Sequence, residues 1–192
     1  MVLSILFAGL GQLYNRSYIK GIILILIELA FIITFSDFIG LGLWGIVTLG
    51  TIPKVDHSIF LLVYGLLSLL MLGIAAVIYV LNVRDAKRQA EQIARGWQRP
   101  KQRETIKQAY MNSIPYILSV PGFILLIFVV VFPLLFAISL AFTNYDLYHS
   151  PPRNLVDWVG FDNFINLVTV PIWNQSFLKV LSWTLVWTIV ST

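Results

Sequence analysis

The sequence predicts an all-α membrane protein with three complete transmembrane helices, a truncated fourth, and amphipathic helices at the membrane surface. Hydrophobic residues make up 58% of the 192-residue chain and charged residues only 11%, whereas a soluble domain carries about 25% charged residues. Several long apolar runs supply the spans, because about 20 apolar residues in a helix cross the hydrocarbon core of a bilayer. There is no cysteine, which excludes disulfides and thiolate metal sites.

The first span is predicted at Gly21–Phe35, between Lys20 and Asp37. Glu28 lies in its middle, where an ionised carboxylate costs a few kcal/mol on insertion. Glu28 is therefore expected to be protonated or to face other protein. Two interpretations stay open: a polar contact with a transport path, or a hydrogen bond to a neighbouring helix.

The segments on either side of this span are expected at the membrane surface. Met1–Asn15 lacks the cationic start and the cleavage site of a signal peptide, so an interfacial helix or a short re-entrant piece is predicted. Phe38–Asp56 contains four glycines and Pro53, which disfavour a stable helix. We expect a loop that dips into the interface, with Trp44 at headgroup level.

The second span is predicted at Ile59–Asn82, which carries no charge. It contains small residues that would let a neighbouring helix approach closely, namely Gly65, Ser68, Gly73, Ala75 and Ala76.

The most charged part of the chain, Val83–Asn112, follows this span. Gly96 and Pro100 are expected to end a first helix, and Arg103–Asn112 to begin a second short one. The first helix is predicted to lie on the membrane surface, because apolar residues recur along it at helical spacing: Val83, Ala86, Ala90, Ile93 and Trp97.

The basic residues are divided unequally between the two sides of this arrangement. Arg16, Lys20 and the eight basic residues of Val83–Asn112 share one side, and the other side holds Lys54, Arg153 and Lys179. By the positive-inside rule, the N-terminus and Val83–Asn112 are predicted in the cytoplasm. Residues 38–58 and 143–176 are then predicted outside.

The third span is predicted at Tyr116–Phe142, which could reach about 40 Å as a helix. Pro121 lies near its start, where proline is tolerated, whereas Pro133 lies inside. Pro133 removes the hydrogen bond to the Val129 carbonyl, so a kink is expected there.

A polar and aromatic segment, Thr143–Phe164, follows as a surface elbow, and a fourth apolar run comes after it. In the elbow, Asp162 is expected to cap a short helix that lies along the headgroups. The fourth run, Phe177–Thr192, covers about 24 Å and is expected to be the truncated start of a longer helix. The apolar face of the short helix comprises Phe161, Phe164, Ile165 and Val168.

Patterns that carry catalysis or bind metals are scarce. The two histidines, His57 and His149, fall in predicted outer loops without carboxylates at metal-ligand spacing. There is no phosphate-binding loop and no G-x-S-x-G pattern. We therefore predict no catalytic, cofactor-binding or metal site, and substrate-binding residues stay unassigned.

Three elements resemble the permease subunits of carbohydrate ABC importers. They are F-T-N-Y at Phe142–Tyr145, V-G-F-D-N-F at Val159–Phe164, and W-T-L-V-W-T at Trp183–Thr188. With the two spans and the basic loop ahead of them, the chain resembles the N-terminal part of a MalF-type permease subunit of maltose/maltodextrin importers. Residues 10–21 and 56–62 add to this resemblance.

The resemblance implies an organisation and a set of partners. Residues 1–115 would form an N-terminal prelude, 116–176 the first core helix and elbow, and 177–192 the start of the permease domain. The partners would be a second permease subunit, two ATPase subunits, an extracellular sugar-binding protein and membrane lipid, with no nucleic acid and no cofactor. The protein would lie in the bacterial cell membrane and import malto-oligosaccharides, while ATP hydrolysis belongs to the ATPase subunits.

The family's cytoplasmic E-A-A-x-x-x-G coupling loop is absent, so a fragment of a longer protein is expected. No coupling or sugar-binding residue can be transferred to this sequence. The alternative is a small membrane scaffold or assembly protein complete at 192 residues. A third alternative is an intramembrane enzyme, which would need ionisable groups gathered around Glu28.

Overall fold

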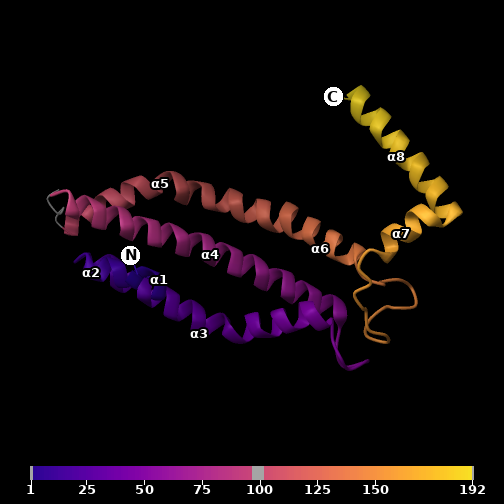
Figure 1. Ribbon diagram of the computed structural model, residues 1–192, viewed down its shortest axis with the longest axis horizontal. Helices are drawn as coiled ribbons and strands as arrows, with labels where there is room; N and C mark the ends of the chain where they lie inside the picture. The colour runs from indigo at the N-terminus through magenta and orange to yellow at the C-terminus, as the bar shows by residue number, and fades with distance from the viewer. Residues whose placement is uncertain (1, 97–101, 192) are drawn as a thin grey trace.

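The computed structural model describes residues 2–96 and 102–191. Within this part of the chain the structure is helical, with no strand and one isolated β-bridge between Thr143 and Trp158. Figure 1 shows long helices running lengthwise, with the C-terminal helix leading away from them. The elements are α1 (Val2–Leu6), α2 (Leu10–Tyr14), α3 (Tyr18–Thr48), α4 (Ser58–Ala94), α5 (Gln102–Leu126), the π-helical turn η1 (Ile127–Val131), α6 (Phe132–Ala141), α7 (Asp162–Thr169) and α8 (Pro171–Ser191).

Three helical stretches of the described residues are long and apolar enough to cross a membrane. They are Tyr18–Thr48, Ser58–Ala94 and Ile114–Ala141. The prediction of an all-α membrane protein with three complete spans is confirmed.

The first span is longer than predicted, because α3 continues through the glycine-rich segment to Thr48. The expected loop over residues 38–48 is therefore wrong. A Cβ added at Gly42 would lie 2.6 Å from the backbone oxygen of Tyr64, and one at Gly45 would lie 3.0 Å from the Leu61 Cβ. The glycines of α3 thus permit close packing on α4, and this tertiary contact outweighs their low helix propensity.

The small residues of α4 divide into two groups. Gly65 and Ser68 lie in the interface with α3, where a Cβ at Gly65 would be 2.9 Å from the Gly42 oxygen. Their predicted packing role is confirmed. Gly73 and Ala76 are exposed, and a Cβ at Gly73 would meet nothing within 4 Å. The packing role predicted for these two residues is wrong within this chain.

The second span and the predicted surface helix are one continuous helix, α4. The expectation of a separate helix on the membrane surface is wrong. Ala86 is buried because α2 packs on it, and a Cβ at Gly11 would lie 3.2 Å from the Ala86 Cβ. The helix ends as expected just before Gly96, whose φ is +80°. Trp97 and Pro100 lie outside the described residues.

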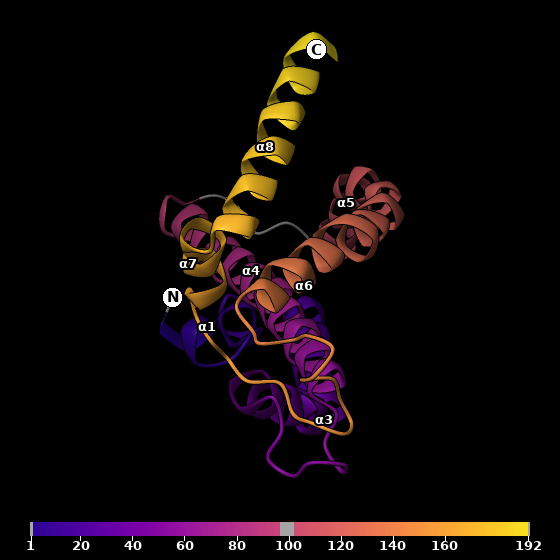
Figure 2. The ribbon, with the colours of Figure 1, turned by 90° about the vertical axis from the view of Figure 1, so that its right-hand side faces the viewer.

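The third span begins earlier than predicted. Residues 103–112 form the first part of α5 rather than a separate short helix, and Pro121 lies inside α5 instead of near a helix start. Where the kink was expected, the structure has the π-helical turn η1, immediately before Pro133 in α6. A residue without an N–H cannot continue the regular hydrogen-bond ladder, and a π-turn accommodates that loss. Figure 2 shows α5 set apart from α4, while α6 packs on α4.

The hydrophobic core lies at the end of the bundle where α3, α4 and α6 meet the elbow, which we define as residues 143–161. Leu49, Leu62, Leu66 and Val156 are almost fully buried there. Side chains of α6 pack against this cluster, including Phe132, Leu135, Phe136 and Leu140.

The last two helices follow the elbow. Asp162 is the first residue of α7 and makes no side-chain cap, so its predicted capping role is wrong. Its carboxylate still lies in the first turn, where the helix dipole favours a negative charge. Helix α8 begins at Pro171, earlier than the predicted Phe177, because proline suits the first position of a helix. Figure 2 shows α8 projecting away from the bundle.

Candidate functional site: polar contacts at the two ends of the bundle

At one end of the bundle, α1 and α2 fold back on the flank of α3 and α4. We call this arrangement the N-terminal junction. Gly9 joins the two short helices with φ +90°, and a Cβ there would lie 3.0 Å from the Cγ1 of Ile25. Ser4 and Gln12 are completely buried. Residues 2–15, in the segment expected as an interfacial helix or a short re-entrant piece, are therefore packed on α3 and α4.

A set of polar side chains holds the junction together. The Gln12 Nε2 donates to the Asn82 Oδ1 at 2.5 Å, and the Asn15 Nδ2 donates to the Ala86 carbonyl at 3.0 Å. The Lys20 ammonium pairs with the Asp85 carboxylate at 2.6 Å. These contacts join segments that lie about 70 residues apart in the chain.

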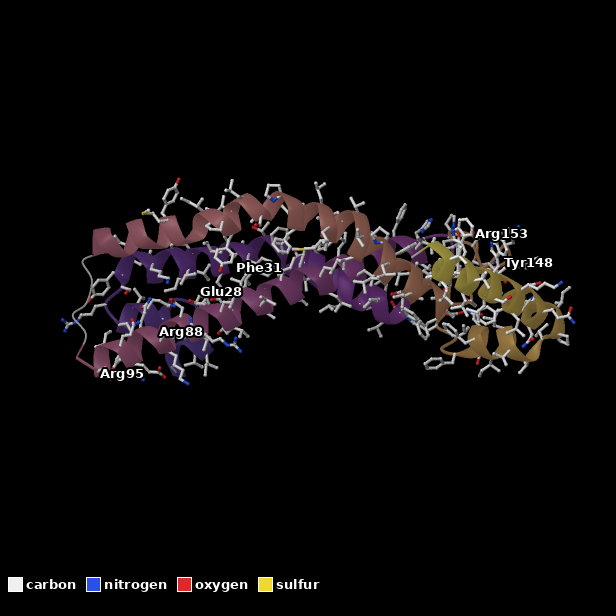
Figure 3. All side chains as sticks on the ribbon, turned by 90° about the horizontal axis from the view of Figure 1, so that it is seen from above. Glu28, Phe31, Arg88, Arg95, Tyr148 and Arg153 are labelled. Atoms are coloured by element: carbon white, nitrogen blue, oxygen red, sulfur yellow. The ribbon has the colours of Figure 1, made fainter. Side chains whose placement is uncertain are left out.

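Glu28 belongs to this junction. Its Oε2 accepts a hydrogen bond from the backbone N–H of Ala8 at 2.7 Å, at the turn between α1 and α2. The nearby Tyr79 hydroxyl donates to the Ile5 carbonyl at 2.8 Å. Figure 3 shows Glu28 on α3, between the two ends of the molecule. Glu28 thus faces other protein as predicted, and its partner is the N-terminal segment rather than another spanning helix.

At the opposite end, the elbow is fastened to α3 and α4. The Trp158 Nε1 donates to the Ile46 carbonyl at 2.9 Å, and the Val156 N–H donates to the Ser58 Oγ at 3.0 Å. The Lys54 N–H donates to the Pro152 carbonyl at 2.8 Å. The Ile46 carbonyl belongs to the last turn of α3, where carbonyls lack partners within the helix, so Trp158 satisfies one of them.

Two carboxylates organise the loops at this end. Backbone N–H groups of Thr51 and Ile52 lie 2.7 and 2.9 Å from the Asp56 Oδ2, and they hold the pKa of that carboxyl below its ordinary value. The backbone N–H of His149 likewise lowers the pKa of Asp146, with smaller contributions from Tyr148 and the His149 ring. Both carboxylates are therefore negative at neutral pH and act as loop clamps.

The two histidines are not brought together. His57 precedes α4 and stacks on Phe60 with ring centroids 4.3 Å apart. The His149 Nδ1 lies 2.9 Å from the Asp146 Oδ1. Within residues 2–96 and 102–191, no group of three histidine, aspartate or glutamate side chains is placed to hold a metal.

Helix α7 presents its predicted apolar face to the surroundings. Phe161, Phe164, Ile165 and Val168 are exposed, and Phe164 contacts Phe142 at a ring-centroid distance of 5.2 Å. An exposed apolar face on a short helix is typical of a membrane interface or a protein contact.

Sequence reasoning missed the polar side of α4. Asn82, Asp85 and Gln89 recur at spacings of three and four residues, so they share one face of the helix. That pattern could have indicated a polar partner within the chain instead of a helix on the membrane surface. No comparable signal links Trp158 with Ile46.

Comparison of the amino-acid sequence with curated proteins finds relatives among transport proteins. The galactooligosaccharides transport system permease protein GanP of Bacillus subtilis is 44% identical over the whole chain. The chain is homologous to permease proteins of sugar transport systems. The maltodextrin transport system permease proteins MdxF of Bacillus subtilis and MalC of Streptococcus pneumoniae are 38% and 35% identical, each over 96% of the chain.

This permease homologue spans less than half the length of the relatives it matches, namely 46% of GanP and 42% of both MdxF and MalC. No protein-family profile matches the chain, and no solved structure matches it significantly. The homology confirms the predicted resemblance to sugar-transport permeases.

Proposed function

We propose that this chain is the N-terminal part of a membrane-spanning permease subunit in an ATP-driven oligosaccharide importer. The observation that carries the proposal is the identity of 35–44% with three sugar-transport permeases over essentially the whole chain. The three apolar helices support it, because a permease must cross the membrane repeatedly.

The substrate is an oligosaccharide, which is the class that the names of the relatives share. The malto-oligosaccharide expected from the sequence is one member of that class, and the galactooligosaccharide of GanP is the other. The sugar-binding residues are not assigned to any residue of this chain.

The contacts at the two ends of the bundle, the N-terminal junction and the elbow, suggest the structural role of this part of the permease. The N-terminal junction ties the first two spans together through Gln12, Asn82 and Glu28. The elbow, fastened by Trp158 to the end of α3, fixes where α7 and α8 begin. The division into a prelude (1–115), a first core helix with its elbow (116–176) and a permease domain (from 177) fits these roles, although α5 runs across the first boundary.

The working transporter would contain a second permease, two ATPase subunits and an extracellular sugar-binding protein in a bacterial cell membrane. The ATPase subunits would hydrolyse ATP. The N-terminus would lie in the cytoplasm, because the basic residues gather on that side.

A chimera tests the proposal. In Bacillus subtilis lacking GanP, the segment of GanP that aligns with this chain is replaced by this sequence, and the uptake of labelled galactooligosaccharide is measured. A second chimera with MdxF is tested with maltodextrin. We expect at least one chimera to restore ATP-dependent uptake, because the spans and the elbow are equivalent.

The native GanP and MdxF genes serve as positive controls, and the empty deletion strains as negative controls. Both chimeras carry an epitope tag that reports their amount in the membrane. If both chimeras are inserted and co-purify with their ATPase subunits but neither transports sugar, the proposed equivalence is wrong.

A further inference from the structure

One face of α4 passes without a break from apolar to basic side chains. The spacings along this face are three, four, three, four and seven residues, which keep successive side chains on the same side of a helix. The face consists of Ile74, Val77, Leu81, Arg84, Arg88 and Arg95, all of them exposed.

The three arginines of this face are electrostatically unsatisfied. None of them makes a hydrogen bond or an ion pair with the described part of the chain. The nearby acids are already engaged: Asp85 pairs with Lys20 at 2.6 Å, and Glu91 lies 3.8 Å from Lys87. Glu91 lies on the same face, three residues after Arg88 and four before Arg95, so the face carries three arginines and one carboxylate and has a net positive charge.

The opposite side of α4 is already occupied. Asn82, Ala86 and Gln89 face the N-terminal junction, where Gln12, Asn15 and Ser17 contact them. This packing directs the arginine face away from α2 and α3. Figure 2 shows α5 set apart from α4, so α5 does not cover the face by close packing.

Arg84 lies at the depth expected of lipid headgroups, Arg88 lies just beyond that depth, and Arg95 lies farther out along the helix. The apolar residues Ile74, Val77 and Leu81 are 46%, 60% and 56% exposed, as expected of a lipid-facing surface. At 1.5 Å per residue, Arg84 lies about 4.5 Å, Arg88 about 10 Å and Arg95 about 21 Å beyond Leu81. The headgroup layer extends roughly 5–8 Å beyond the hydrocarbon core.

Figure 3 shows Arg88 and Arg95 at one end of the molecule and Arg153 at the other. We propose that Arg84 and Arg88 bind the phosphates of anionic phospholipids, and that Arg95 adds positive charge farther from the membrane. A guanidinium group donates two parallel hydrogen bonds to a phosphate, and each basic residue near an anionic surface strengthens binding about fivefold. The inference rests on the membrane insertion of α4 and is independent of the transported sugar.

The experiment uses the assembled permease complex in nanodiscs made from an equal mixture of phosphatidylcholine and phosphatidylglycerol. The chain has no native cysteine, so Val80→Cys, an exposed position one helical turn before Arg84, carries a single environment-sensitive dye on this chain. Its quenching is compared when either phosphatidylglycerol or phosphatidylcholine is brominated. The ratio of the two quenching constants measures which lipid gathers beside the arginine face.

We expect phosphatidylglycerol to be preferred, and each of R84Q and R88Q to lower the preference about fivefold. R95Q should lower the preference less, because Arg95 lies about 21 Å beyond Leu81 and the attraction falls off within a Debye length. The triple variant should lose it. The matched control is K54Q/R153Q, which removes two exposed cations at the other end and should leave the preference unchanged. Triple replacement by lysine should keep most of the preference, since the charge remains, and salt should weaken it.

Equal quenching by the two lipids in the native protein would overturn the proposal, as would a preference that survives in R84Q/R88Q/R95Q. If the triple variant keeps its lipid preference but loses a co-purifying subunit, the arginines bind an acidic protein surface instead. If the triple variant does not insert into the membrane, the lipid preferences of the single variants still test the proposal.

Discussion

Gly42 on α3 lies directly against the backbone of Tyr64 on α4, so that a Cβ at Gly42 would stand 2.6 Å from the Tyr64 carbonyl oxygen. A backbone oxygen cannot rotate away as a flexible side chain can. The Ser68 side chain also lies in this contact. The contact therefore fixes how closely the first two spans approach.

Gly42→Ala is expected to lower the free energy of unfolding by about 1–3 kcal/mol, because the added methyl group overpacks the interface. Unfolding of the purified permease by denaturing detergent measures the change. Gly40→Ala is the matched control, since a Cβ at Gly40 meets nothing within 4 Å. Equal stability of the two variants would contradict the close approach.

Asn82→Ala is expected to destabilise the N-terminal junction by about 1–3 kcal/mol, because the buried Gln12 amide loses the Asn82 Oδ1 and keeps only the Asn82 carbonyl at 3.3 Å as acceptor. Gln12→Ala should cost less in the Asn82→Ala background than alone. A double-mutant cycle on unfolding free energies measures the coupling, with an expected value of at least about 0.6 kcal/mol. The exposed Gln92→Ala provides the control, and strict additivity of the two changes would argue against the contact.

Trp158→Phe is expected to loosen the elbow from α3, because the phenyl ring has no N–H for the Ile46 carbonyl. The loss corresponds to about 1 kcal/mol, the usual net value of one hydrogen bond. Hydrogen exchange of the amides in residues 50–57 and 150–158 should become faster. Trp173→Phe, at an exposed position in α8, should leave these amides unchanged.

The loop at residues 49–57 is expected to loosen in acid. The Thr51 and Ile52 N–H groups lower the pKa of Asp56, so the clamp is fully present above the ordinary aspartate pKa of about 3.9. It is lost as the pH falls through the lower pKa of the folded state. A dye on Val55→Cys should report loosening only below about pH 4. In Asp56→Asn the response at low pH should be absent.

The orientation of the chain can be tested because there is no native cysteine. Cysteine is introduced at Ala94 or at Ser150, and intact cells are treated with a thiol reagent that does not cross membranes. We expect labelling at position 150 alone, since the basic residues predict a cytoplasmic end for α4. Labelling at position 94 without labelling at 150 would reverse the proposed topology.

Composition and the apolar runs were sufficient for the class of fold and for the number of complete spans. The limits of the helices were not predictable to the same degree. Gly42 and Gly45 disfavour a helix when each residue is considered alone, yet they lie inside α3 because α4 packs on them. In the same way, the apolar spacing around Ala86 predicted a surface helix, although α2 covers that side of α4.

The N-terminal junction and the elbow depended on distant pairing. Glu28 was recognisable as a costly group that needs a partner, because a carboxylate inside an apolar run is rare. Its partner, the Ala8 N–H, was not recognisable, since every residue except proline offers the same backbone donor. The contact of Trp158 with Ile46 spans 112 positions and carries no local pattern.

The sequence by itself therefore determined that this chain crosses a membrane, where its long apolar runs lie, and which family it resembles. These properties follow from the transfer of side chains between water and lipid, which each segment expresses alone. Only the tertiary structure decided where α3 and α4 begin and end, what satisfies Glu28, and which face of α4 leaves Arg84, Arg88 and Arg95 unpaired. Those properties depend on which helix packs against which, and packing joins residues that the sequence keeps far apart.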